Sequence, residues 1–154
     1  MGSLNERKGW FRRLFGRSTA SPLDPTRDDL VVVVSGFDDA EACSTALDRA
    51  AATDPQWVPE AEAVLRHHLR LPAEGRGEAV RIAAQDGYEA VDSDSASGGG
   101  EAVRVVLQRV QVLDPLHCSQ ERSRMAGLAQ RLDGTVDGWD AMQPAARDGV
   151  APGP

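Results

Sequence analysis

The sequence contains little of what catalytic, metal-binding or membrane-spanning proteins depend on. It has two cysteines, Cys43 and Cys118, and no Cys-x-x-Cys pair, and aromatic residues make up 5% of the chain. No Walker loop, dinucleotide fingerprint or Gly-x-Ser-x-Gly motif is present. No run approaches the ~20 apolar residues that a transmembrane helix needs, and the N-terminal region lacks the apolar core of a signal peptide. We therefore expect a cytoplasmic protein with reduced thiols.

Positive and negative charges are distributed unevenly along the chain. Residues 1–27 hold six basic and two acidic side chains, a net charge of +4, whereas residues 28–154 hold 11 basic and 22 acidic side chains, a net charge of −11. An acidic surface repels phosphate backbones and attracts cationic protein segments. The charge therefore predicts a basic protein partner and no direct contact between the domain and nucleic acid.

The length and the composition predict one domain between two tails. We expect a flexible basic arm at residues 1–27, a folded domain at 28–142 and a disordered tail at 143–154. Within the arm, Trp10–Phe15 places aromatic and leucine side chains at helical spacing among arginines. Such a patch suits a weak contact with an anionic membrane surface, and the alternative is a tail without a partner.

Apolar periodicity predicts an α+β fold. The continuous run at 30–35 indicates a strand buried on both faces, which we expect in the centre of a sheet. Further strands are expected at 64–71, 88–91 and 102–112, a turn with a short extended piece at 135–142, and helices after residue 38, at 77–85 and at 115–132. From the second strand onward the order is β-α-β-β-α-β, the ferredoxin-like pattern of an antiparallel sheet covered by helices.

The apolar residues of the long strand at 102–112 change parity along its length. Val103, Val105 and Leu107 alternate on one face, whereas Val110 and Val112 fall on the other. A β-bulge at Gln108-Arg109 would bring both sets to one face, and we expect one there.

The histidines and cysteines do not combine into a metal site or a catalytic dyad. His67 and His68 are adjacent on a strand, so they point to opposite faces and cannot share an ion. Cys118 lies near a helix N-terminus beside His117, but neighbouring helix positions do not face each other. We expect buried structural thiols, no metal, no cofactor and no catalysis.

The segment Gly134-Thr135-Val136-Asp137-Gly138-Trp139-Asp140 follows the last helix and combines acids, glycine and a tryptophan. In one interpretation, Asp137 and Gly138 form a turn and Trp139 fills the end of the helix–sheet core. In the other, Asp137, Trp139 and Asp140 form part of a partner surface, because aromatic residues are enriched at interface hot spots.

On these features the chain resembles the regulator of ribonuclease E activity B (RraB) family. The likeness extends over about residues 28–142. It rests on the order of elements, on the strand Arg66–Pro72 with its two histidines, on Gly87–Glu89 opening the next strand, and on the Asp137–Trp139 motif.

The resemblance implies a non-catalytic protein that binds ribonuclease E and restrains its cleavage of RNA. It implies that the partner-binding residues are Asp137, Gly138, Trp139, Asp140 and His68. The alternative is a ferredoxin-like module that binds a small ligand or serves an unrelated complex. A pocket lined by converging polar groups would favour the module, and a flat acidic face bearing Trp139 would favour the regulator.

Overall fold

Five strands form one antiparallel sheet in the computed structural model, which describes residues 22–91 and 102–145. The strands are β1 (Leu30–Gly36), β2 (Glu62–Pro72), β3 (Glu89–Val91), β4 (Ala102–Val112) and β5 (Thr135–Pro144). The helices are α2 (Cys43–Ala51), α3 (Arg76–Ala84) and α4 (Pro115–Arg131), and a 3₁₀ turn, η2 (Ala73–Gly75), precedes α3. Each element that the periodicity predicts is present, and the fold class is α+β as expected.

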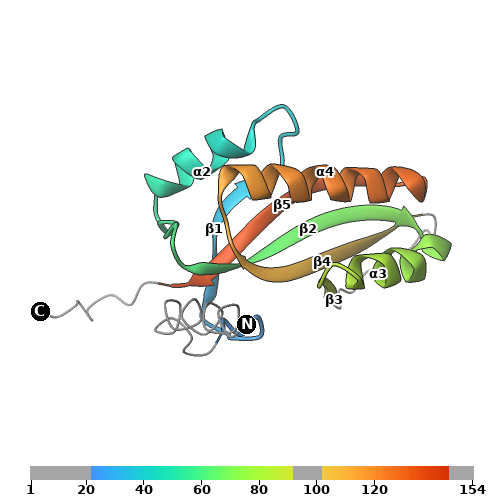
Figure 1. The fold of residues 1–154 in the computed structure, drawn as a ribbon, viewed down its shortest axis with the longest axis horizontal. Helices are drawn as coiled ribbons and strands as arrows, with labels where there is room; N and C mark the ends of the chain where they lie inside the picture. Colours follow the sequence, from blue (N-terminus) through green and yellow to red (C-terminus); the bar gives the residue numbers. More distant parts are fainter. Residues whose placement is uncertain (1–21, 92–101, 146–154) are drawn as a thin grey trace, which may run out of the picture.

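The strand order is β1-β5-β2-β4-β3, and all neighbouring strands are antiparallel (Figure 1). The part β5-β2-β4-β3, with α3 and α4 as connections, has the strand order of a β-α-β-β-α-β ferredoxin-like sheet. This confirms the fold predicted from the second strand onward. The remaining strand, β1, is added to the sheet beside β5.

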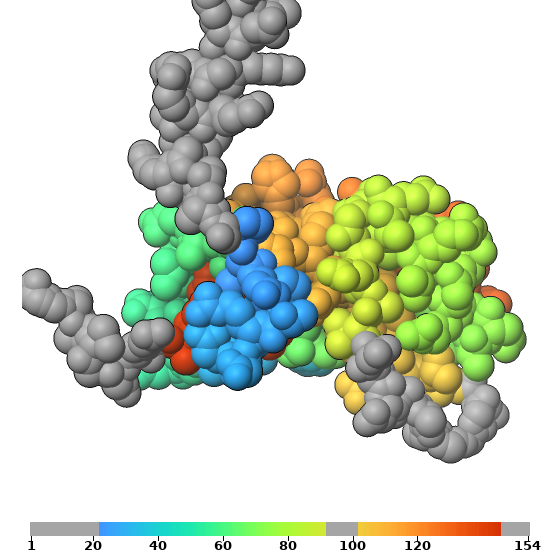
Figure 2. Space-filling model, turned by 90° about the horizontal axis from the view of Figure 1, so that it is seen from below, coloured from blue at the N-terminus to red at the C-terminus, as the bar shows by residue number. Residues whose placement is uncertain are grey.

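The expectation that β1 lies in the centre of the sheet is wrong, because β1 is an edge strand. Its apolar run was interpreted as burial on both faces, but a register shift between Val32 and Val34 changes the alternation. Val33 and Val34 are both buried in the core, while Val32 points to the other face and is 41% exposed. The run is thus continuous because of a bulge, and residues 22–36 lie at the molecular surface, blue in Figure 2.

The bulge expected at Gln108-Arg109 is also wrong. β2 and β4 pair over eleven consecutive positions without a shift, from Glu62 opposite Val112 to Pro72 opposite Ala102. Val110 stands opposite Val64, which is fully buried although it belongs to the face turned away from the helices. The apolar residues of β4 therefore change face along an unbroken strand, because this second face is also apolar at that end.

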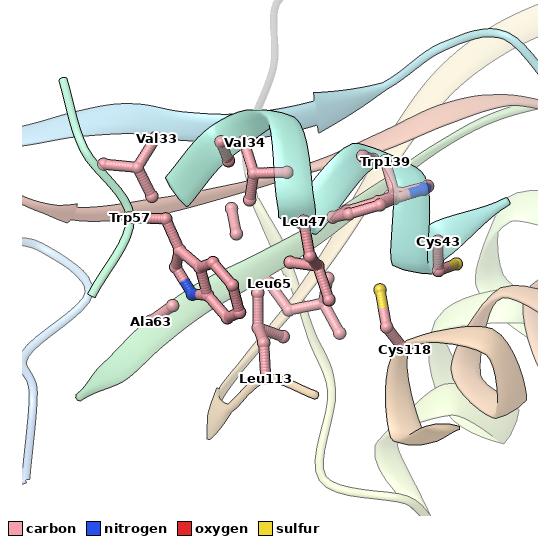
Figure 3. Close-up of a cluster of buried hydrophobic side chains, with 13 residues drawn as sticks. Val33, Val34, Cys43, Leu47, Trp57, Ala63, Leu65, Leu113, Cys118 and Trp139 are labelled. Carbon is pink, nitrogen blue, oxygen red and sulfur yellow. The ribbon is translucent and has the colours of Figure 1, made fainter. Parts of the chain in front are cut away.

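The three helices lie on one face of the sheet, with α2 and α3 at its opposite ends (Figure 1). We call this the helix face, and the face turned away from the helices the outer face. The core beneath the helices consists of two clusters. The first gathers around Trp139, Trp57 and Leu47 (Figure 3). The second lies under α3 and the C-terminal half of α4 and contains Leu69, Leu71, Ala79, Ala83, Tyr88, Val105, Leu107, Met125, Leu128 and Ala129.

The expected arm and tail lie mostly outside the described residues, and so does the Trp10–Phe15 patch. The described ends of both segments contact the domain. The Leu23 N–H donates to Glu62 Oε1 at 2.7 Å. Gln143, which is 3% exposed, extends β5 and donates from Nε2 to Val58 O at 3.0 Å. Contacts with the sheet therefore extend to Leu23 on one side and to Gln143 on the other.

Candidate functional site

A charged network joins β2 to β5 on the outer face of the sheet. Arg66 stands opposite Asp140 in the register, so its guanidinium donates to both carboxylate oxygens, at 2.7 Å from Nε and 2.9 Å from Nη2. His68 Nε2 lies 2.9 Å from Asp140 Oδ2. The Asp140 side chain is 6% exposed, whereas those of Arg66 and His68 are 23% and 12% exposed. A bidentate pair in this setting fixes the geometry of both side chains.

The environment of Asp140 keeps its carboxyl ionised. Burial alone would raise the pKa of Asp140, but the hydrogen bonds from His68 and Arg66, with the charge of Arg66, outweigh it, and the pKa lies below its ordinary value. Asp140 therefore holds two neighbouring side chains as a permanent anion at neutral pH.

An exposed aromatic residue and a second ion pair flank this network. Phe37, which is 52% exposed, lies against Gly138 and meets the ring of His68 at 5.2 Å between centroids. A Cβ on Gly138 would collide with the Phe37 ring, so only glycine permits this approach. Asp137 accepts from Arg70 Nε at 3.0 Å; the Arg70 side chain is exposed and that of Asp137 is half-buried. The arrangement presents an aromatic side chain between fixed charges, as protein interfaces commonly do.

Trp139 lies on the helix face, opposite to this group. It is 2% exposed and belongs to the first core cluster, so the interpretation in which it fills the end of the core describes its position. Its indole covers Gly36, where a Cβ would collide with Nε1. In the described residues Trp139 is therefore not part of a flat acidic face, the arrangement that would favour the regulator. Trp139 instead borders a cavity of about 410 Å³. Its partner role stays a prediction that depends on access through this cavity.

A second polar group lies beneath the helices, between the two core clusters. Tyr88 Oη donates to Glu121 Oε1 at 2.7 Å and lies 3.4 Å from His67 Nε2. Arg109 places its guanidinium over the Tyr88 ring, 4.6 Å from the centroid, and pairs with Glu121 at 3.3 Å. The charges of Arg109 and Glu121 therefore compensate each other at the point where both side chains enter the core.

The hydrogen bonds of this group determine how His67 is protonated. Burial would raise the pKa of Glu121, but Tyr88 and the two neighbouring arginines, Arg109 and Arg124, outweigh it and lower that pKa. Because the Tyr88 proton points to Glu121, the Tyr88 oxygen accepts from His67, which places the His67 proton on Nε2. His67 Nδ1 is then an acceptor, and it has no hydrogen-bond partner in the described part of the chain. Burial lowers the pKa of His67 to about 4.

The neutral state of His67 predicts a loss of stability in mild acid. The unfolded chain binds a proton at the ordinary histidine pKa of 6.5, but the folded chain does so only at about 4. The stability contributed by His67 is complete above the higher value and falls as the pH drops toward the lower one. We expect the free energy of unfolding, measured in urea, to fall by about 2 kcal/mol between about pH 7.5 and about pH 4.5.

Two single-residue variants test whether His67, and not another titrating group, causes this loss of stability in acid. His67→Gln should remove most of this pH dependence, whereas His117→Gln, at a side chain that is 59% exposed, should retain it. Equal dependence in wild type and His67→Gln would show that His67 is not the group responsible.

The remaining candidates for chemistry are structural. Cys43 and Cys118 are buried and face each other between α2 and α4 (Figure 3), and burial raises the pKa of Cys118. His67 and His68 point to opposite faces, as the strand period requires. Across residues 22–91 and 102–145, no three His, Cys, Asp or Glu side chains are grouped as metal ligands would be. No helix in the same ranges is long and apolar enough to span a bilayer.

The structure brings together four of the five predicted partner-binding residues and separates the fifth. His68, Asp137, Gly138 and Asp140 meet on the outer face, where Arg66 and Phe37 join them, while Trp139 points away. Sequence analysis did not single out Glu121. Its spacing from Cys118 and Met125 does place it on the buried stripe of α4, and an acid on such a stripe is a signal that could have identified it.

The fold and this group of side chains define a small α+β protein of ferredoxin-like topology, with a fixed polar surface on the sheet face that the helices leave free. Residues 56–141 match the family model described as RraB, regulator of ribonuclease activity B. The match covers more than half of the chain and extends from just before β2 into β5, and the chain belongs to this family. No curated protein and no solved structure matches the chain.

Proposed function

We propose that the chain is a non-catalytic regulator that binds ribonuclease E and slows its cleavage of RNA. In this proposal it acts in the cytoplasm by contact with protein, uses no cofactor, and its domain does not bind nucleic acid directly. The observation that carries the proposal is the family match over residues 56–141, which contains the whole outer-face network. We assign the contact with the ribonuclease to His68, Asp137, Gly138 and Asp140, with Trp139 supporting β5 from beneath.

The charges of the described residues support a protein partner rather than RNA. Acidic side chains outnumber basic ones 19 to 11 in residues 22–91 and 102–145, which gives a net charge of −8. On the outer face Arg66 is paired with Asp140 and Arg70 with Asp137, and Arg104 stands opposite Arg70 on the same face. A phosphate backbone would be repelled by the excess of acidic side chains, and carboxylates already occupy two of these three arginines.

An RNA-cleavage assay with purified ribonuclease E tests the proposal. We expect the full chain to slow cleavage at saturating concentration, and Asp137→Ala to weaken the inhibition about tenfold, because the Asp137 side chain is 31% exposed and its removal leaves Arg70 unpaired. Glu74→Ala removes the same charge from an exposed position in η2 and should not change the inhibition. Undiminished cleavage at saturating wild-type protein would refute the proposal.

The cavity beside Trp139 favours a second candidate function, binding of a small ligand. It is lined by residues from several parts of the chain, including the charged residues Asp39 and Arg122, and His67 lies at its wall. Such convergence is typical of ligand sites. A fragment screen by NMR that finds no compound shifting the Trp139 indole signal would leave this candidate without support.

A further inference from the structure

The negative charge of the protein is concentrated in one unit of the fold. Residues 28–62, which contain β1 and α2, hold nine acidic residues and one basic residue, a net charge of −8. Residues 63–91 hold four of each sign, and residues 102–145 hold five of each. The remainder of the described domain is therefore neutral, and the acidic unit lies almost entirely before the family match, which begins at residue 56.

The same unit contains a long sheet edge. In the described ranges β1 pairs with β5 alone, so the main-chain groups along its other side belong to no ladder. A groove of about 160 Å³ follows this side and is bordered by four consecutive residues, 32–35, together with Arg49, Thr53 and Asp54. The side chains of Val33 and Val34 are buried in the core, so these two residues border the groove mainly through their backbone.

One contact confirms that a main-chain acceptor faces this groove. Arg49 donates from Nη2 to Ser35 O at 3.3 Å, and its side chain is 48% exposed. The same Nη2 atom forms a shorter ion pair with Glu41 Oε1 at 2.6 Å. The long bond to Ser35 O is thus the weaker of the two, and an incoming strand can replace it. The other edge of the sheet offers less room, because β3 has three residues against seven in β1.

We infer that the free edge of β1 is a docking site for an extended, cationic segment of a partner protein, which pairs with β1 as a sixth strand. The pairing supplies main-chain hydrogen bonds, and the charge of residues 28–62 selects for arginine or lysine. Val32, one of the five exposed large apolar residues in the described chain, borders the groove and gives the segment an apolar contact. The inference rests on the proposed function only for the identity of the partner.

Two synthetic peptides test the mode of binding. The first alternates arginine and valine and is about as long as β1, and the second has the same sequence with the amide nitrogen of every valine methylated, which removes its donors along one edge. We expect fluorescence anisotropy with the full chain to give binding of the first peptide and at least about tenfold weaker binding of the second. Equal affinities would overturn the strand-pairing model.

Charge variants of the full chain test the location. Asp48→Asn, Asp54→Asn and Glu60→Gln together remove three exposed charges of residues 28–62, of which Asp54 borders the groove, and we expect them to weaken binding of the first peptide about tenfold. The matched control removes three exposed charges elsewhere, with Glu74→Gln, Glu89→Gln and Asp133→Asn, and should leave the affinity within about twofold. Equal losses in both variants would show a general charge effect and no site.

Hydrogen exchange and sedimentation separate other occupants of the edge. The β1 amides that point away from β5 should exchange fast in the free full chain and slow down with the first peptide. Protection of these amides in a sedimenting monomer would assign the edge to another segment of this chain, and their protection with a dimer would assign it to a second copy. Either result overturns the inference.

The two charge variants also separate this inference from the proposed function. If ribonuclease E binds the two charge variants equally well, the regulator proposal stands but β1 is not the ribonuclease-binding site. If the first peptide binds at β1 and ribonuclease E does not bind the chain, the β1 docking site stands and the regulator proposal fails. Absence of binding by both probes would overturn both.

Discussion

Replacing Trp139 by alanine is expected to lower the free energy of unfolding by about 4 kcal/mol, the usual cost of removing a large aromatic side chain from a core. Trp139 is 2% exposed, and its neighbours Val34, Leu65 and Ala141 come from three strands that cannot close the space without moving the sheet. A domain of this size is commonly stable by about 5–15 kcal/mol, so this single change threatens folding itself. Urea denaturation followed by circular dichroism at neutral pH measures the loss.

Two further variants keep the Trp139 prediction testable. Phe37→Ala, at an aromatic side chain that is 52% exposed, should cost less than about 1 kcal/mol. If the alanine variant does not fold, Trp139→Phe should fold with an intermediate loss, because it fills part of the same space. A loss in Trp139→Ala no larger than that in Phe37→Ala would mean that the indole is not a core side chain.

Replacing Asp140 by alanine is expected to cost about 3 kcal/mol, because it leaves the Arg66 charge and His68 without their shared acceptor on a largely buried part of the sheet. Asp137→Ala makes the same chemical change three residues earlier on the same strand, in a pair whose side chains are 53% and 31% exposed. There the expected cost is below about 1 kcal/mol. Comparison of the urea midpoints of the two variants measures how burial changes the cost of losing an aspartate–arginine pair, because the strand and the residue type are the same in both.

The cost of Asp140→Ala should depend on pH in a defined direction. The pKa of Asp140 is lowered in the folded protein, so its contribution is present above the ordinary carboxyl pKa and is lost as the pH falls through the folded value. The difference between wild type and Asp140→Ala should therefore narrow below about pH 4. A difference that stays constant into strong acid would show that the network is held by shape rather than by the carboxylate charge.

Local patterns predicted the elements of this fold but not all of their neighbours. Alternation located the strand at 102–112 with its observed bounds, and the order of elements gave the ferredoxin-like arrangement from β2 onward. The position of β1 was missed because one bulge, near Val33, produces the same apolar run as burial on two faces. A continuous apolar run indicates that the side chains are buried but does not indicate whether the strand has one neighbouring strand or two.

The candidate site shows the same limit. The sequence singled out Asp137–Asp140 and His68, but the bonds that join them to Arg66 connect residues more than seventy positions apart and follow from strand register. Trp139 and Asp140 are adjacent, and the strand period alone places them on opposite faces once the segment is a strand rather than a turn. Expecting a turn there left both on one surface.

The core of this protein is divided where β2 and α4 each place a polar residue between apolar ones. His67 separates Leu65 from Leu69 on the strand, and Glu121 separates Cys118 from Met125 on the helix. Each side of this divide holds its own helix, α2 on one and α3 on the other, and its own set of apolar neighbours. Three elements, β2, α4 and β5, contribute side chains to both clusters, and we expect the amides on the two sides of the divide to exchange at different rates.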